Sequence, residues 1–207
     1  GDLDELSVAE ELLRFRELDP AFRGNSFGTI AAFGPHGALP HYQAVPETNA
    51  RLLGDTLLLL DSGGQYVGGT TDITRTIAVG TPTDDMCRDY TAVLQAHIAV
   101  ATATFPVGTR GAHLDSLARN VMWRHGIDFS HRLGHGIGCF MGVHEPAVTL
   151  SQLGTDIIEK GMYISNEPAY YRMGEYGIRL ENDVIVVESD MPGFLKLDTV
   201  SLVPFDP

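Results

Sequence analysis

The chain has 207 residues, of which 43% are hydrophobic and 20% charged, enough for one substantial hydrophobic core. Its formal net charge of −13 repels nucleic acids and anionic membrane surfaces, so neither is an expected partner. No apolar run approaches the roughly 18 residues of a membrane span, and the acidic N-terminus lacks the blocks of a signal peptide. Because Cys87 and Cys139 form no disulfide framework, we expect a cytoplasmic protein.

The first part of the chain predicts one helix and then strands. Residues 6–18 place apolar side chains at helical spacing behind the N-cap candidates Asp4 and Ser7, which indicates an amphipathic helix. Residues 25–32 have strand character and lead into the loop that carries His41. Residues 57–79 then predict a hairpin of two buried strands that turns at consecutive glycines.

The rest of the chain predicts two helices followed by strands. The first helix begins at Thr83 and runs to about residue 105, and the second covers residues 113–125. A short helical turn is expected at residues 157–160, and strands are expected at 162–165, 178–188 and 195–204. Helices between groups of strands, without strict alternation, favour an α+β fold with a mixed, largely antiparallel sheet. We treat residues 1–207 as a single domain.

Two aspartates in the predicted hairpin point to a metal ion. Asp61 ends an apolar run of four leucines, and Asp72 follows eleven positions later, which is an odd number. On one continuous strand their side chains would lie on opposite faces, but a turn at Gly68 and Gly69 allows the carboxylates to converge. Two carboxylates held close together repel each other unless a proton or a cation lies between them. The hairpin therefore predicts a metal site.

Three histidines lie in the glycine-rich stretch SHRLGHGIGCFMGVHEP, at positions 131, 135 and 144. Clustered glycines suggest backbone packed closely around a ligand or an ion, although any one of these histidines alone is equally well explained as an ordinary polar residue. His131 and His135 have the spacing of a zinc-protease helix. The glycines disfavour a helix there and no glutamate follows His131, so we do not adopt that interpretation.

Two glutamates lie at the edges of predicted strands. Glu167 directly precedes Pro168, where a strand must end or bend. Glu181 interrupts an apolar alternation, and a buried carboxylate is costly unless it is paired. Arg179 lies two residues earlier on the same face, so a structural ion pair with Glu181, or with another carboxylate, is the alternative to a metal-binding role.

Together, the candidate ligands supply four carboxylates and one imidazole: Asp61, Asp72, His135, Glu167 and Glu181. Such oxygen-rich ligands suit Mn²⁺, Co²⁺ or Zn²⁺, and four negative charges balance two divalent ions. Two ions about 3.5–4 Å apart activate a bridging water and polarise the carbonyl group that it attacks. The composition of this set therefore predicts a two-metal hydrolytic site.

The sequence resembles the catalytic, pita-bread-fold domain of aminopeptidase P (Xaa-Pro aminopeptidase), in the metallopeptidase group that also holds prolidase and methionine aminopeptidase. The resemblance covers nearly the whole chain, in the segments TIAAFGPHGALPHYQAVPETN, LLLLDSGGQYVGGTTDITRT, GHGIGCFMGVHEP, NEPAYY and GIRLEND. It implies a curved, mostly antiparallel sheet covered by helices. It also implies hydrolysis of the N-terminal Xaa-Pro bond of peptides by a hydroxide held between two divalent ions, with Mn²⁺ expected and Co²⁺ or Zn²⁺ as alternatives.

The resemblance assigns the five candidate ligands to two ions. Asp61 would chelate one ion, and His135 with Glu167 would hold the other. Asp72 and Glu181 would bridge the pair. Glu167 would also handle the proton of the attacking hydroxide.

The resemblance further implies which residues contact the peptide. His41 and His144 would contact the scissile bond and the tetrahedral intermediate and assist proton transfer to the proline nitrogen. His131 and Tyr171 would line the proline pocket, and Arg179 would fix the bridging carboxylates.

Some features of the sequence depart from the family pattern. Ala169 replaces a usual glycine, and Arg132 replaces the glycine that usually follows His131, as in some prolidases. The interval between His135 and His144 is longer than is usual in prolidases. The alternatives to an aminopeptidase are a prolidase, which cleaves Xaa-Pro dipeptides, and a non-catalytic binding module. The N-terminal domains and helical tail of the family are missing, so we expect a fragment that a homodimer or a partner chain completes.

Overall fold

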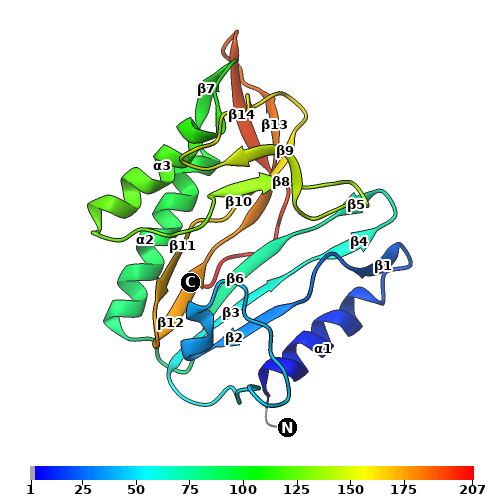
Figure 1. Cartoon of the computed structure of the whole chain (residues 1–207), viewed down its shortest axis with the longest axis vertical. Helices are drawn as coiled ribbons and strands as arrows, with labels where there is room; N and C mark the ends of the chain where they lie inside the picture. Colours follow the sequence, from blue (N-terminus) through cyan, green and yellow to red (C-terminus); the bar gives the residue numbers. More distant parts are fainter. Residues whose placement is uncertain (1–2) are drawn as a thin grey trace.

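The computed structural model describes residues 3–207 and has the α+β fold that the sequence predicts (Figure 1). Within these residues the helices are α1 (Glu5–Arg16), α2 (Asp84–Ala101), α3 (Gly111–Arg124) and the short 3₁₀ helix η1 (Gly34–Ala38). None of the described helices has both the length and the apolar character that crossing a membrane requires.

In residues 3–207 the strands form four antiparallel sheets. They are β1 (Phe22–Asn25), β2 (Ile30–Phe33), β3 (Thr56–Ser62), β4 (Gly64–Tyr66), β5 (Gly69–Thr70), β6 (Ile73–Val79), β7 (Thr104–Pro106), β8 (Gly134–Gly136), β9 (Glu145–Leu150), β10 (Tyr163–Asn166), β11 (Ala169–Arg172), β12 (Tyr176–Arg179), β13 (Asn182–Glu188) and β14 (Phe194–Thr199). The sheet orders are β1-β4-β5, β2-β3-β6, β11-β12 and β7-β14-β13-β10-β8-β9. Every described strand pair is antiparallel, so the predicted mixed character is wrong. Helix α2 connects β6 to β7, which lie in different sheets, whereas α3 connects β7 to β8 within the six-stranded sheet, where the two strands are not neighbours.

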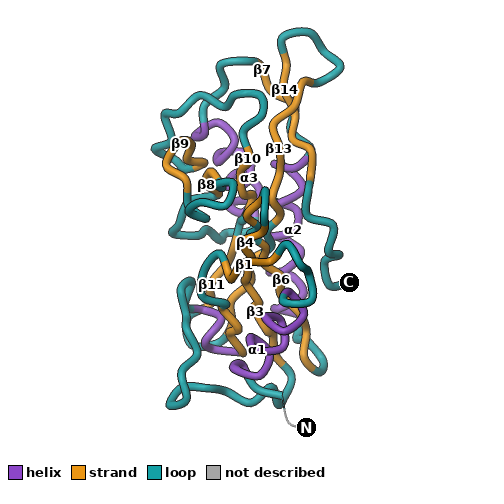
Figure 2. Tube along the Cα trace, turned by 90° about the vertical axis from the view of Figure 1, so that its right-hand side faces the viewer, coloured by secondary structure: helices purple, strands orange, loops and turns teal. Residues whose placement is uncertain are grey.

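The sheets occupy two ends of an elongated molecule. Both views place α1 and β3 in the half of the molecule that holds the N-terminus, β1 and β4 near the middle, and β7, β8, β9, β13 and β14 in the opposite half (Figures 1 and 2). Helices α2 and α3 pack against each other and lie along one side of the strands in Figure 1. One core cluster joins these helices to both ends, with Val93 and Leu114 packed in the same cluster as Leu57, Ile178 and Val184.

Local signals placed several elements correctly. Helix α1 starts behind the N-cap Asp4, whose Oδ1 accepts from the Ser7 amide at 2.8 Å, while Ser7 Oγ accepts from the Asp4 amide at 2.9 Å. The predicted hairpin is also present. Strand β3 pairs with β6. Between these two strands in the sequence, β4 and β5 form a smaller hairpin that turns at Gly68, whose φ is +93°.

Other predicted boundaries are wrong because tertiary pairing overrides the local pattern. Helix α2 ends at Ala101, and Phe105 instead lies in β7, paired with Leu195 of β14. The predicted strand at 25–32 is interrupted between β1 and β2, and that at 178–188 is broken at residues 180–181 between β12 and β13. Residues 157–160 form no helical turn, since Ile157 makes an isolated antiparallel bridge to Arg110. Strand β11, which sequence patterns did not predict, is formed by pairing with β12.

A buried, neutral histidine in α2 connects this helix to the strands. The His97 side chain is 2% exposed; its Nδ1 donates to the Leu180 carbonyl at 3.2 Å and its Nε2 accepts from Asn182 Nδ2 at 3.3 Å. Asn182 cannot turn its amide around, because its Oδ1 accepts from Arg75 Nη2 at 2.7 Å. A proton on Nε2 would therefore face an N–H group. Burial lowers the pKa of His97 to about 4.

This histidine makes stability depend on pH. Its pKa is lower in the folded chain than the ordinary 6.5, so the unfolded chain binds the proton first as the pH falls. The contribution to stability is complete above about pH 6.5 and is lost between about pH 6.5 and 4. Between pH 7.5 and 5, we expect the free energy of unfolding of the wild type to fall by about 2 kcal/mol more than that of His97→Gln, measured with denaturant. Equal falls in both proteins would contradict this prediction.

Candidate metal centre

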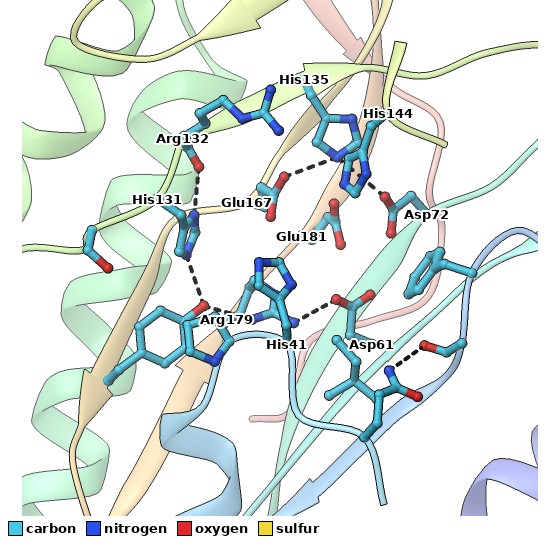
Figure 3. A pocket seen from close by; sticks show the side chains of 17 residues that line it. His41, Asp61, Asp72, His131, Arg132, His135, His144, Glu167, Arg179 and Glu181 are labelled. Carbon is cyan, nitrogen blue, oxygen red and sulfur yellow. Dashed lines mark hydrogen bonds and ion pairs between the residues drawn. The ribbon is translucent and has the colours of Figure 1, made fainter. Parts of the chain in front are cut away.

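The five predicted ligands converge where several strands end. Asp61 lies near the end of β3, and Asp72 directly precedes β6. His135 is in the middle of β8, Glu167 follows β10, and Glu181 fills the break between β12 and β13. All five line one cavity of about 420 Å³, into which the labelled side chains point in Figure 3. Also lining it are Phe27, Gly28, Ile30, Pro40, His41, Gln43, Ser130, His131, Arg132, His144, Tyr171 and Arg179.

Three of the predicted ligands form a compact, buried group. Asp72, His135 and Glu181 each offer one ligand atom, and these atoms lie within 4.8 Å of one another. His135 Nε2 lies 3.2 Å from Glu167 Oε1 and 3.5 Å from Asp72 Oδ2. His135 Nδ1 lies 2.9 Å from the Gly136 carbonyl, to which it can only donate. This tautomer leaves Nε2 to face the carboxylates, as a metal-binding imidazole requires.

The buried carboxylates lack enough compensating charge from the protein. Among residues 3–207, the buried atoms Asp61 Oδ1 and Glu181 Oε1 have no hydrogen-bond partner. Burial raises the pKa of Asp61 to about 7 against the opposing charge of Arg179. Burial and the negative charge of Asp72 raise the pKa of Glu181 well above its ordinary range. Carboxylates that line one cavity and keep unpartnered oxygens fit divalent cations, which would supply the missing charge.

Arg179 contacts a different carboxylate from those expected. Its Nη2 donates to Asp61 Oδ2 at 2.6 Å, whereas it was predicted to fix Asp72 and Glu181. It reaches Glu181 only through Thr74, whose Oγ1 accepts from Arg179 Nε at 3.2 Å and donates to Glu181 Oε2 at 2.8 Å. The structural ion pair of this arginine is thus formed with Asp61 and not with Glu181.

Arg179 also begins a hydrogen-bonded chain along the cavity wall. Its Nη1 donates to the Tyr171 hydroxyl at 2.7 Å, and that hydroxyl lies 2.9 Å from His131 Nε2. His131 Nδ1 donates to the Arg132 carbonyl at 2.7 Å, so its Nε2 accepts from Tyr171. Burial raises the pKa of Tyr171 to about 12 and lowers that of His131. Both side chains are therefore neutral at physiological pH.

His41 and His144 reach the cavity from loops. His144 lies between β8 and β9, with its ring 4.3 Å from that of His135 at 72°. His41 lies in the loop after η1, and Figure 3 shows its ring pointing into the cavity. Both side chains are exposed, as groups that contact an incoming molecule must be. Partial burial lowers the pKa of His144, which favours the neutral imidazole.

Asp183 supports the centre but was not among the predicted residues. Its Oδ2 accepts from the Asp72 amide at 3.0 Å and from the Tyr163 hydroxyl at 2.6 Å, which holds the backbone of one predicted ligand. Ser165 acts similarly, since its Oγ accepts from the His135 amide at 3.0 Å and donates to Glu167 at 3.1 Å. The position of Asp183 two residues after Glu181 in a strand-like run was the one signal that could have identified it.

The amino-acid sequence matches a known protein family. The chain fits the model of metallopeptidase family M24 over residues 2–188. It belongs to this family. It is 43% identical over 98% of its length to a protein of Laccaria bicolor named probable Xaa-Pro aminopeptidase P. It spans about a third of that relative, 33%.

Solved structures agree with this assignment. The X-prolyl aminopeptidase of Caenorhabditis elegans, described as a cytosolic enzyme with a di-nuclear active site, has a TM-score of 0.93 and 36% identity over 97% of this chain and 34% of that one. The prolidase of Pyrococcus furiosus has a TM-score of 0.84 and 31% identity over 95% of this chain and 55% of that one. The pita-bread fold expected from the sequence is thereby confirmed.

The Arg179 to Asp61 ion pair should stabilise the folded protein strongly. Both side chains are buried, so Arg179→Met leaves a buried carboxylate without its cation and should lower the free energy of unfolding by about 3 kcal/mol in metal-free protein. Arg172→Met is the matched control, because its pair with Asp85 at 2.9 Å is partly exposed and should be worth less than about 1 kcal/mol. Equal losses in the two variants, measured with denaturant, would show that Asp61 does not depend on Arg179.

Proposed function

We propose that this M24 chain forms one catalytic domain that removes the N-terminal residue from peptides whose second residue is proline. The observation that carries the proposal is the convergence of four carboxylates and His135 on one cavity, with buried carboxylate oxygens that lack partners. Membership of the family and the similarity to proteins named Xaa-Pro aminopeptidase support it. A non-catalytic module would be expected to have lost some of these ligands, and all five are present.

The cofactor of this reaction would be a pair of divalent metal ions. Asp61, Asp72, His135, Glu167 and Glu181 would hold them, and the di-nuclear site of the nematode relative supports two ions. Mn²⁺ suits the predominance of oxygen ligands, and Co²⁺ and Zn²⁺ are the alternatives. When bound, such ions polarise the substrate carbonyl and activate a water molecule.

The side chains of the cavity would orient the peptide and move its protons. Glu167, whose side chain is 16% exposed, would accept the proton of the attacking water. The imidazoles of His41 and His144 would hydrogen-bond the scissile carbonyl and assist proton transfer to the departing proline nitrogen. His131 and Tyr171 would enclose the proline ring, which offers no N–H to recognise and therefore needs walls more than acceptors. Arg179 would hold Asp61 and Tyr171 in place.

The partners and location follow from the same proposal. The substrates would be short peptides that enter the cavity with proline at the second position. We propose a cytoplasmic location, which the nematode relative described as cytosolic and the exposed free thiols of Cys87 and Cys139 support.

Two substitutions should separate metal binding from catalysis. Asp72→Ala removes one member of the compact ligand group and should abolish both bound metal and turnover. His144→Ala removes an exposed imidazole without a metal role and should keep the metal while kcat falls about 100-fold or more. Metal content by elemental analysis and kcat on an Xaa-Pro-Xaa tripeptide check both outcomes. Full activity in either variant would refute the assigned roles.

Substrate length should separate the aminopeptidase from the prolidase. After chelation and addition of Mn²⁺, Co²⁺ or Zn²⁺ in turn, we expect cleavage of Xaa-Pro-Xaa tripeptides and little cleavage of Xaa-Pro dipeptides, measured by release of the first residue. Cleavage of dipeptides alone would establish the prolidase alternative. Absence of both bound metal and cleavage would favour a binding module.

A further inference from the structure

Glu5, the first residue of α1, is a fully buried carboxylate outside the metal centre. Its side chain is 0% exposed, and four donors surround its two oxygens. Oε1 accepts from the Phe33 amide at 2.7 Å and from His36 Nδ1 at 2.8 Å. Oε2 accepts from the Tyr42 hydroxyl and the Ala50 amide, both at 2.9 Å. A buried carboxylate is tolerated only when it is hydrogen-bonded in this way.

All four donors belong to one segment, residues 33–50. This segment begins at the last residue of β2, contains η1 and then runs from 39 to 50 without helix or strand, so no strand pairing holds residues 39–50. Glu5 binds the backbone at both ends of the segment, at Phe33 and at Ala50, and its own amide donates to the Ala50 carbonyl at 3.1 Å. A single carboxylate therefore joins both ends of a long irregular segment, which is otherwise tied to the rest of the chain by hydrogen bonds such as those of Gln43 to Gly28 and of the Leu6 amide to Asn49.

His41 lies in the middle of this segment. Within the described part of the chain, no hydrogen bond or ion pair of the His41 side chain restrains it, so its position depends on its backbone. The next residue, Tyr42, turns away from the cavity: it is buried, belongs to a small core cluster with Ile30 and Leu59, and stacks on His36 at 4.3 Å and 22°. Burial raises the pKa of the Tyr42 phenol, so the phenol stays protonated and donates to Glu5.

We propose that Glu5 is a positioning residue for His41. The carboxylate holds Tyr42 and His36, these hold the backbone of the loop, and the loop presents the His41 imidazole to the cavity. This inference rests on the proposed function for its effect on turnover, because His41 matters there only if the cavity cleaves peptides. Its structural part, the anchoring of residues 39–50, can be tested without any activity.

Glu5→Gln is the sharpest substitution because it preserves shape and changes one atom. Each carboxylate oxygen accepts from a backbone amide, Oε1 from Phe33 and Oε2 from Ala50. In either orientation the new amino group therefore faces an N–H, and a hydrogen bond is lost that the backbone cannot replace. We expect amide hydrogen exchange of residues 39–50 to quicken about tenfold or more in this variant.

A double-mutant cycle tests whether the effect passes through His41. We expect Glu5→Gln to lower kcat/KM on an Xaa-Pro-Xaa tripeptide about tenfold in the wild type, and less than about twofold in the His41→Ala background. Bound metal should stay unchanged throughout. Equal fold losses in the two backgrounds would overturn the proposal, because a general structural effect is independent of His41.

Ser7→Ala provides the matched control on the same helix. It removes half of the capping box of α1, in which Ser7 Oγ accepts from the Asp4 amide, and leaves the four donors of Glu5 in place. We expect lower stability with unchanged kcat/KM and unchanged exchange at residues 39–50. If this control reproduces the losses of Glu5→Gln, then the stability of α1 alone explains them and the proposal fails.

Two further outcomes are decisive. If Glu5→Gln does not fold, Tyr42→Phe takes its place in the double-mutant cycle, because it removes one donor to Glu5 and keeps the aromatic ring. A loss of kcat/KM that is equally large in the His41→Ala background then overturns the proposal. If the wild type cleaves no Xaa-Pro peptide, the proposed function fails, whereas the anchoring by Glu5 fails only if exchange at residues 39–50 is unaffected by the substitution.

Discussion

Repulsion among buried carboxylates is the constraint on which the centre of this molecule depends. Asp61, Asp72, Glu167 and Glu181 line one cavity, and Arg179 ion-pairs with Asp61 alone among them. Burial opposes the charged forms of Asp61 and Glu181, and the neighbouring carboxylates add to the cost. Cations between the carboxylates remove both penalties at once. The electrostatics that would destabilise this site without metal are thus the same electrostatics that would bind two divalent ions tightly.

The surrounding strands hold these charges in place through groups that do not face the metals. Thr74 on β6 connects Arg179 to Glu181, and Asp183 on β13 holds the amide of Asp72. These bridges join strands of different sheets, because β6, β12 and β13 belong to three separate sheets that meet at the cavity. The ligands are therefore held mainly by strand register and hydrogen bonds, whereas His41 and His144 are presented by loops.

Local patterns along the chain were enough to predict the α+β class, the hairpin of residues 57–79 and the capped helix α1. Each depends on neighbours in sequence: glycines at a turn, apolar periodicity and an N-cap. The five candidate ligands were also singled out, because carboxylates and histidines interrupt apolar or glycine-rich runs, and the structure brings all five to one cavity. The resemblance to a metallopeptidase family then ordered them into one centre, and the chain's membership of that family is established by its similarity to known members.

Contacts between distant segments could not be predicted in this way. Asp72 and Asp183 are 111 residues apart, and Arg179 and Asp61 are 118 apart; nothing near either residue specifies its partner. The same applies to Glu5, which sequence patterns show only as the first acid of a helix. The short strand β7 replaced the end of a predicted helix for a related reason, since pairing with β14 outweighed local helical preference. Composition and spacing in the sequence identify the chemical groups of the site, whereas the packing of the strands determines which of these groups come into contact.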